Sequence, residues 1–188
     1  MTQGLQAGPD GLLRCPWSLA TPDYLRYHDE EWGKPVRSDT GVFERLCLEA
    51  FQSGLSWLTI LRKRENFRRA FADFDVETVA RFGPADVGRL LADQGIVRNR
   101  AKIEAVVANA QAALGLADGI AAQVWQYADA AAPAPVTLAD IPSSTSASAA
   151  LAKDLRRHGF RFTGPVTAYA TMQACGVVND HLAGCTSR

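Results

Sequence analysis

The fold of this chain is decided by one stretch, Leu46-Cys47-Leu48-Glu49-Ala50-Phe51-Gln52-Ser53-Gly54-Leu55-Ser56-Trp57. With the period of an α-helix, its first half carries an apolar stripe, and Glu49 falls at the margin of that stripe. Gly54 can adopt the left-handed conformation that ends a helix, and Ser56 can cap a next helix beginning at Trp57. The stretch predicts a corner between two helices where a carboxylate and an indole could hold a flat polar ligand. The alternative is a solvent-exposed Glu49 beside a core Trp57, because most carboxylates are exposed.

Size and composition indicate a single folded unit. The chain has 188 residues, of which 47% are hydrophobic and 21% charged, as is usual for a globular protein with a buried core. No apolar run approaches the length of a membrane span, and the first residues lack the pattern of a secretion signal. We therefore expect a cytoplasmic protein with no membrane partner.

Net charge gives no indication of a nucleic-acid partner, because 20 basic side chains balance 20 acidic ones. The local distribution is more informative, since basic residues gather in two places. The two clusters are Arg62, Lys63, Arg64, Arg68 and Arg69, and Arg98, Arg100 and Lys102. Each cluster could bind phosphate or could be an ordinary solvated helix face.

Apolar periodicity predicts helices along the whole chain and no clear strand, so the predicted fold class is all-α. One Ala/Pro-rich segment, Ala128 to Pro135, is predicted to be a loop. A helix running to about His158 is entered through hydroxyl-rich residues at 141–146. The other predicted helices cover residues 24–31, 41–53, 56–71, 76–82, 84–93, 98–114, 116–128 and 166–175.

The segment Leu90 to Lys102 has the form of a helix-hairpin-helix, with Gly95 at a tight turn followed by an apolar plug and a basic helix start. A hairpin leading into a helix N-terminus presents free backbone N–H groups and the positive end of the helix dipole, which suit a phosphate. Such a contact positions a protein on DNA without reading the base sequence. An ordinary turn between two helices remains the alternative, because the usual second glycine is missing near Arg98.

Cysteine and histidine residues near the two ends of the chain could form one metal site. Cys15 and His28 stand near the start, and His181-x-x-x-Cys185 stands near the end. Together they would make a closed Cys₂His₂ site of the kind that holds structural zinc. A Cys15–Cys185 disulfide and four unconnected surface residues are the alternatives. Cys47 and Cys175 lie in apolar helical patterns and are expected to be core thiols.

Aromatic residues are unusually frequent beside the first two of these residues. They are Trp17, Tyr24, Tyr27 and Trp32. Packing in the core is the simplest interpretation of such a set. However, the polar run from His28 to Glu31 lies among them, which favours the wall of a cleft.

Four motifs carry a family resemblance that extends from Arg14-Cys15-Pro16-Trp17 to His181-Leu182-Ala183-Gly184-Cys185. The chain resembles the bacterial 3-methyladenine DNA glycosylase I family. The motifs are Tyr27-His28-Asp29-x-Glu31-Trp32-Gly33, Leu48-Glu49-x-x-x-x-Gly54-Leu55-Ser56-Trp57, Ser144-Thr145-Ser146-Ala147-Ser148 and Met172-Gln173-Ala174-Cys175-Gly176-x-Val178-Asn179-Asp180-His181.

The resemblance implies a helix-hairpin-helix glycosylase fold in one catalytic unit, expected to be monomeric. Its core would cover about residues 40–130, and segments 12–36 and 140–185 would form a subdomain clipped by zinc. One structural Zn²⁺ per chain would be held by the four residues that match the family's ligands. These are Cys15, His28, His181 and Cys185.

The resemblance also implies the reaction, which is hydrolysis of the N-glycosidic bond of 3-methyladenine in double-stranded alkylated DNA, with free 3-methyladenine as a product and no lyase step. Glu49 and Tyr27 would be the catalytic residues, and Asp180 is expected to be structural. Trp57, Trp17 and Tyr24 would complete the base pocket. The DNA contacts would come from Gly95, Arg98, Arg100, Lys102, Ser144, Thr145 and Ser146. A DNA-binding protein without turnover, or an enzyme for alkylated guanines, is the alternative.

Overall fold

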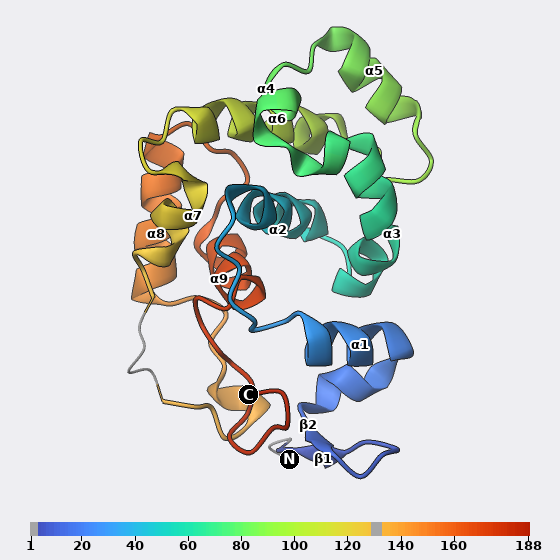
Figure 1. Ribbon diagram of the computed structural model, residues 1–188, viewed down its shortest axis with the longest axis vertical. Helices are drawn as coiled ribbons and strands as arrows, with labels where there is room; N and C mark the ends of the chain where they lie inside the picture. The colour runs from blue at the N-terminus through green and yellow to red at the C-terminus, as the bar shows by residue number, and fades with distance from the viewer. Residues whose placement is uncertain (1–3, 129–132) are drawn as a thin grey trace.

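Helix α2 (Asp39–Gln52) forms the centre of the structure, with most of the other helices packed around it (Figure 1). The structure is a computed structural model and describes residues 4–128 and 133–188. Ser38 caps the helix, since its Oγ accepts a hydrogen bond from Gly41 N at 3.2 Å. Every residue from Leu46 to Phe51 is buried. The sequence predicted a stripe on one side, but α2 is covered on nearly all sides, so Glu49 is buried as well.

The structure confirms the prediction of a helical fold. The other α-helices in the described residues are α1 (Pro22–Glu30), α3 (Trp57–Ala70), α4 (Val76–Ala80), α5 (Pro84–Ala92), α6 (Arg100–Leu114), α7 (Gly119–Trp125), α8 (Ser146–Arg157) and α9 (Pro165–Ala174). Short 3₁₀ turns cover Pro16–Ala20, Ala72–Phe74 and Leu138–Asp140. Helix α7 is shorter than the predicted 116–128. Residues 129–132 of the predicted Ala/Pro-rich loop lie outside the described residues.

One small element departs from the all-α prediction. Strands β1 (Gln6–Ala7) and β2 (Leu13–Arg14) pair antiparallel, with Gln6 opposite Arg14 and Ala7 opposite Leu13. Strands this short leave almost no alternating pattern in the sequence, so period-two analysis does not detect them.

The main hydrophobic core lies between α2 and the helices around it. Phe51 from α2 packs against Phe67 of α3, with ring centroids 4.6 Å apart, and against Phe71 at 6.0 Å. Helices α8 and α9 contribute Leu151 and Met172 to the same core. The sequence assigned residues 140–185 to the terminal subdomain, whereas α8 and α9 pack with the central helices.

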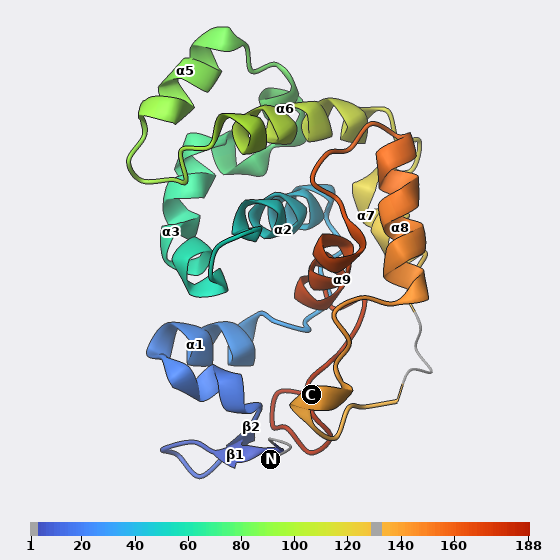
Figure 2. The same cartoon turned by 180° about the vertical axis from the view of Figure 1, so that it is seen from behind.

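The two ends of the chain meet below α1, at the side away from α5 and α6 (Figures 1 and 2). A second, smaller hydrophobic cluster lies there and contains Cys15, Leu182 and Cys185. Thr186 N donates a hydrogen bond to Leu13 O at 2.9 Å, which joins the last residues to β2. The segment after α9 therefore returns to the N-terminus.

No single helix in the described part of the chain is long and apolar enough to cross a membrane. Helices α6 and α7 reach that length and composition only as a pair, and they are bent by 90° from one another.

Candidate functional site

A cavity of about 310 Å³ opens between α1, the end of α2, the start of α3 and α9. It is lined by Trp17, Tyr24, Tyr27, Trp32, Glu49, Gln52, Trp57, Ala170 and Gln173. The structure thus brings together all five residues that the sequence assigned to the base pocket. Trp32 was expected only as part of a cleft wall, and Gln52, Ala170 and Gln173 were not assigned to the site. Gln52 follows Glu49 by three residues on the same helix face, which is the signal that could have identified it.

The corner between α2 and α3 has the predicted local structure. Gly54 has a φ of +81°, a conformation that favours glycine. Ser56 caps α3, since its Oγ accepts a hydrogen bond from Thr59 N at 3.3 Å. Trp57 is the first residue of α3. The corner therefore places Trp57 at the cavity that Glu49 reaches from the end of α2.

Glu49 is buried, with 7% of its surface exposed. Among the described residues, no group donates a hydrogen bond to its carboxylate. Burial raises the pKa of this carboxyl from 4.5 to about 8. Removing a carboxylate from water without a partner is unfavourable, so the position favours a ligand that brings its own hydrogen-bond donor or positive charge.

Trp57 and Tyr27 bring hydrogen-bond donors to the same cavity. The Trp57 indole Nε1 is buried and has no hydrogen-bond partner within the described residues. The Tyr27 side chain is 7% exposed and its ring lies 5.4 Å from the Trp57 ring. Burial, and then the neighbouring Glu49, raises the pKa of the Tyr27 phenol, so it stays protonated. Glu49 therefore offers the cavity an acceptor, and Trp57 and Tyr27 offer donors beside aromatic faces.

The other aromatic side chains support the cavity wall. Tyr24 OH accepts a hydrogen bond from Leu58 N at 3.1 Å and so ties α1 to the first turn of α3. Trp17 packs edge-on against Tyr24 and against Trp32, with ring centroids 5.7 and 5.1 Å away. The alternative in which this set only fills the core is therefore not what the structure shows.

Gln173 and Asp180 form a fixed polar network next to the cavity. Asp180 is buried, and its Oδ2 accepts hydrogen bonds from Tyr169 OH at 2.6 Å and from Gln173 Nε2 at 2.8 Å. Both contacts hold α9 to the segment that follows it. This arrangement is consistent with the structural role expected for Asp180.

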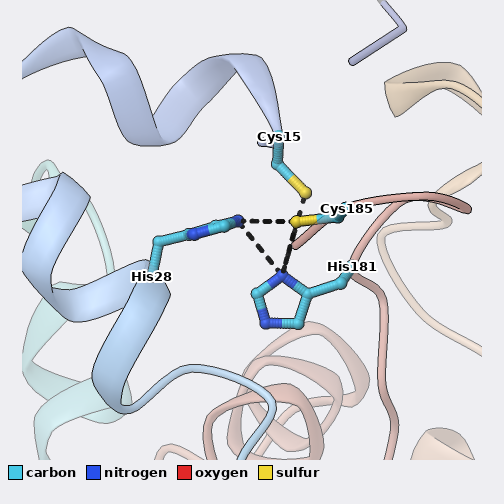
Figure 3. Close-up of side chains that lie close together, drawn as sticks. All are labelled: Cys15, His28, His181 and Cys185. Carbon is cyan, nitrogen blue, oxygen red and sulfur yellow. Dashed lines mark hydrogen bonds between the residues drawn. The ribbon is translucent and has the colours of Figure 1, made fainter. Parts of the chain in front are cut away.

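Cys15, His28, His181 and Cys185 form one buried cluster, as Figure 3 shows. Their ligand atoms all lie within 4.8 Å of one another. His28 Nε2 is 3.1 Å from His181 Nδ1 and 3.5 Å from Cys185 Sγ. Cys15 Sγ is 3.9 Å from His181 Nδ1. All four cysteines of the chain are free thiols, so the structure contains no Cys15–Cys185 disulfide, and Cys47 and Cys175 are buried in the core as predicted.

Neighbouring groups orient both histidine rings. His28 Nδ1 lies 2.7 Å from Asp29 Oδ1, and Arg14 donates to the same carboxylate at 3.0 Å. His181 Nε2 lies 2.9 Å from Trp32 O. A Cβ at Gly33 would lie 2.9 Å from the His181 ring, so only glycine fits there. Two soft thiols and two oriented imidazoles could hold a metal ion.

The cluster of Cys15, His28, His181 and Cys185 also borders the cavity. The His28 ring packs edge-on against Trp17 at 5.2 Å, and the His181 ring packs against Trp32 at 4.8 Å. Trp17 and Trp32 both line the cavity. The cluster therefore supports the aromatic wall from behind.

The predicted hairpin is present between α5 and α6. Gly95 N donates to Asp93 Oδ1 at 2.7 Å, and the buried Ile96 is the expected apolar plug. Asn99 caps α6, since its Oδ1 accepts a hydrogen bond from Lys102 N at 3.2 Å. Arg98 and Arg100 are exposed. Arg100 also forms an exposed ion pair with Glu104 at 3.3 Å, which a phosphate could replace.

Lys102 differs from the sequence prediction. Only 8% of its surface is exposed, and its ammonium donates hydrogen bonds to Phe51 O at 2.8 Å and Ser53 O at 2.5 Å. Its side chain is directed into the protein, because it satisfies carbonyl groups at the end of α2. Lys102 is therefore removed from the set of predicted phosphate contacts.

The first basic cluster is also used within the protein. Arg62 pairs with Asp23, Arg64 with Glu31 and Arg68 with Glu44, at 3.0, 2.5 and 2.8 Å. Lys63 donates to two backbone carbonyls of the hairpin. These contacts join α3 to α1, to α2 and to the hairpin, so most of this cluster does not form a free phosphate patch.

The residues at the hydroxyl-rich entry to α8 differ in their contacts and in their exposure. Thr145 caps the helix, with its Oγ1 accepting a hydrogen bond from Ser148 N at 3.1 Å. The Thr145 hydroxyl accepts in this contact, so its O–H can still donate to a phosphate oxygen. Ser144 is half-buried and Ser146 is exposed.

Comparison with known proteins gives consistent results. The family model for methyladenine glycosylases matches residues 17–188. DNA-3-methyladenine glycosylase 1 of Escherichia coli (strain K12) is 46% identical over 177 residues, covering 92% of this chain and 95% of the relative. A crystal structure of a 3-methyladenine DNA glycosylase I superimposes with a TM-score of 0.87 at 46% identity, covering 92% of this chain and 98% of the other. A 3-methyladenine DNA glycosylase I from Staphylococcus aureus, whose structure concerns recognition of 3-methyladenine, is 36% identical with a TM-score of 0.86, covering 93% of this chain and 95% of the other.

Proposed function

This chain belongs to the methyladenine glycosylase family, and we propose that it is a DNA repair enzyme that excises N3-methyladenine from double-stranded alkylated DNA. The reaction is hydrolysis of the N-glycosidic bond, which leaves an abasic site and releases free 3-methyladenine. One observation carries the proposal. Glu49 lies buried without a hydrogen-bond donor in an aromatic cavity, beside the unpartnered indole of Trp57.

The cavity suits a methylated adenine in charge and in shape. Methylation at N3 makes the base of the nucleotide cationic, and electron-rich aromatic faces attract a flat cation. The Glu49 carboxylate can accept a hydrogen bond from the exocyclic amino group, and a nearby cation also lowers the pKa of this carboxyl. The methylated base therefore supplies the hydrogen-bond donor and the positive charge that the Glu49 carboxylate lacks.

The reaction needs little acid catalysis from the protein, because a cationic base is already a good leaving group. The enzyme has to extract the nucleotide from the duplex, hold the base and stabilise the positive charge that develops on the sugar while water attacks. Glu49 supplies negative charge on the base side. Tyr27, whose phenol stays protonated, donates a hydrogen bond to an acceptor nitrogen of the base.

Selection against normal purines follows from the same groups. An unmethylated base is uncharged and leaves poorly, and a base without an amino group opposite Glu49 would leave a buried carboxylate unpaired. Among the described residues no lysine lines the cavity. We therefore assign a monofunctional glycosylase without a lyase step.

We assign zinc to the cluster of Cys15, His28, His181 and Cys185. Four protein ligands would fill a tetrahedral Zn²⁺ and leave no open position, so this ion has a structural role. When bound, it holds the N-terminal segment to the C-terminal segment. The base chemistry is left to the side chains of the cavity.

Duplex DNA is held at the hairpin, where the N-terminus of α6 presents free N–H groups and a positive dipole end. Gly95 allows the close turn, and the exposed Arg98 and Arg100 add positive charge. Ser144, Thr145 and Ser146 contact the sugar-phosphate backbone of the DNA at the entry to α8. The protein acts as a monomer in the cytoplasm.

The decisive experiment is a released-base assay on methylated duplex DNA, with the products separated by chromatography. The wild-type protein releases free 3-methyladenine. The Glu49→Ala variant binds duplex DNA containing an abasic site within about threefold of wild type, but its single-turnover excision falls by at least about 100-fold, equal to the loss of an interaction of about 3 kcal/mol in the transition state.

Two results contradict the proposal. A wild-type protein that binds the duplex and releases no base would be a binding module without turnover. Release of alkylated guanine without 3-methyladenine would show a different base preference.

A further inference from the structure

The side chain of Lys102 connects the hairpin region to the base pocket. Lys102 is in the first turn of α6, where Asn99 is the cap. Its ammonium crosses to the end of α2 and donates hydrogen bonds to Phe51 O and Ser53 O, at 2.8 and 2.5 Å. Phe51 follows Glu49 by two residues on the same helix. One side chain therefore links the start of the helix that follows the hairpin with the end of the helix that carries Glu49.

The Lys102 ammonium is unusual because it is buried against carbonyl groups and has no carboxylate partner among the described residues. The last carbonyl groups of a helix lack partners within the helix and carry the negative end of its dipole, so a cation stabilises them. Among the described residues, however, Lys102 forms no ion pair with a carboxylate, and burial lowers the pKa of its ammonium. Keeping a cation there is unfavourable unless its contacts are specific. The position therefore favours a lysine whose role is to fix geometry.

A second lysine makes a similar link from the other side of the corner. Lys63 on α3 donates hydrogen bonds to Gln94 O and Gly95 O, both at 3.2 Å. Asn66 Nδ2 also donates to Gly95 O, at 3.1 Å. Figure 2 shows the connection between α5 and α6 lying beside α3. The hairpin is thus held by α3, while α6 is held to α2.

Resting on the proposed function, we propose that Lys102 is a positioning residue that fixes the distance between the phosphate contact at the hairpin and the base pocket at the α2–α3 corner. DNA bound at the hairpin then presents its extruded nucleotide where Glu49 and Trp57 can receive it. A free base needs the pocket alone, whereas a base within DNA needs both sites in register. Lys102 therefore affects excision from DNA far more than binding of the free base.

The test compares Lys102→Met with Lys153→Met. Lys153 is exposed on α8, so its replacement removes the same charge without touching the corner. Three quantities are measured for each variant: binding of free 3-methyladenine by quenching of tryptophan fluorescence, the salt dependence of binding to undamaged duplex DNA, and single-turnover excision from methylated duplex DNA. Lys102→Met keeps free-base affinity within about twofold and keeps the wild-type salt slope, while its excision rate falls at least tenfold below Lys153→Met.

Two outcomes would overturn the proposal. One is an excision rate within twofold of the Lys153→Met control. The other is a slope of log DNA affinity against log salt concentration that is smaller than the wild-type slope by about one, together with an excision rate that falls only in proportion to DNA affinity. That result would make Lys102 an ordinary phosphate contact. If Lys102→Met does not give a cooperative thermal transition, Lys102→Gln, which retains an N–H donor, is judged by the same three measurements.

The experiment distinguishes failure of this proposal from failure of the proposed function. Failure of the proposed function appears in the wild-type protein, which would then release no 3-methyladenine. Failure of the positioning role leaves wild-type release intact and makes Lys102→Met equal to its control. Amide hydrogen exchange separates a local effect from general destabilisation. In Lys102→Met the amides of residues 52–56 should exchange faster, while the amides of α8 and α9 should keep their wild-type rates.

Discussion

At the scale of single residues, Glu49 shows what the sequence can and cannot specify. Helical period placed it at the edge of an apolar stripe, and that was enough to make a carboxylate there unusual. The chain segments that cover it come from α1 and α9, which are far away in the sequence. Its burial could therefore not be derived from the stretch around it. The resemblance, rather than the period, supplied its expected partner.

The raised pKa of Glu49 predicts how stability depends on pH. The carboxyl has a pKa of 4.5 when unfolded and about 8 when folded, so folding favours its protonated form. The stability that this group contributes is full below pH 4.5 and is lost as pH rises to about 8. Glu49→Gln cannot lose a proton. Relative to wild type, the variant should therefore gain stability between these pH values, by up to about 5 kcal/mol.

Urea unfolding at pH 5, 7 and 9, without DNA or free base, measures this difference. The expected result is near-equal stability of the two proteins close to pH 5 and a difference that grows up to pH 8 and then stays constant. The same difference at every pH would mean that Glu49 is not the titrating group.

At the scale of elements, local signals predicted the helix boundaries well and the pairing of charges poorly. Ser56 caps α3 as expected, because a cap depends on residues only three positions apart. The basic cluster on α3 was different, since its partner Glu31 directly follows α1 and its partner Glu44 lies on α2. No local pattern reports such contacts. The buried end of the Lys102 side chain was missed for the same reason.

The hairpin predicts a specific salt dependence for DNA binding. Arg98 is exposed and lies just before the cap of α6, where a phosphate would be held. Arg98→Ala should weaken binding to undamaged duplex DNA about equally for all sequences, and it should reduce the slope of log affinity against log salt by about one. Fluorescence anisotropy over a range of salt concentrations measures both.

Arg157→Ala is the matched control for this measurement. Arg157 is exposed at the C-terminal end of α8, away from the hydroxyl-rich entry to that helix, and it pairs with Asp154. Its replacement removes the same charge and should leave the slope unchanged. Equal slopes for Arg98→Ala and wild type would place the phosphate contact elsewhere.

At the scale of the whole molecule, the Cys/His cluster joins two pairs of residues that lie far apart in the sequence. Cys15 and His28 are close in the chain, and so are His181 and Cys185, but nothing local connects the two pairs. Reasoning from residue types therefore left a disulfide and unconnected residues open. The structure brings the four together because the segment after α9 returns to the N-terminus and builds a small cluster of its own.

Removal of the metal should therefore affect both the chain ends and the base pocket. Cys185→Ser should lower the zinc content from about one ion per chain to near zero, as measured by elemental analysis, and should lower the free energy of unfolding by several kcal/mol. Because Trp17 and Trp32 pack on the two histidine ligands, its affinity for free 3-methyladenine should also fall. Cys47→Ala is the control that separates loss of zinc from loss of stability, since Cys47 is a buried core thiol away from the cluster. This variant should lose some stability while keeping its zinc and its affinity for the free base. A full equivalent of zinc in Cys185→Ser would contradict the assignment of the ligands, and unchanged free-base affinity in a zinc-free protein would show that the aromatic wall stands without the metal.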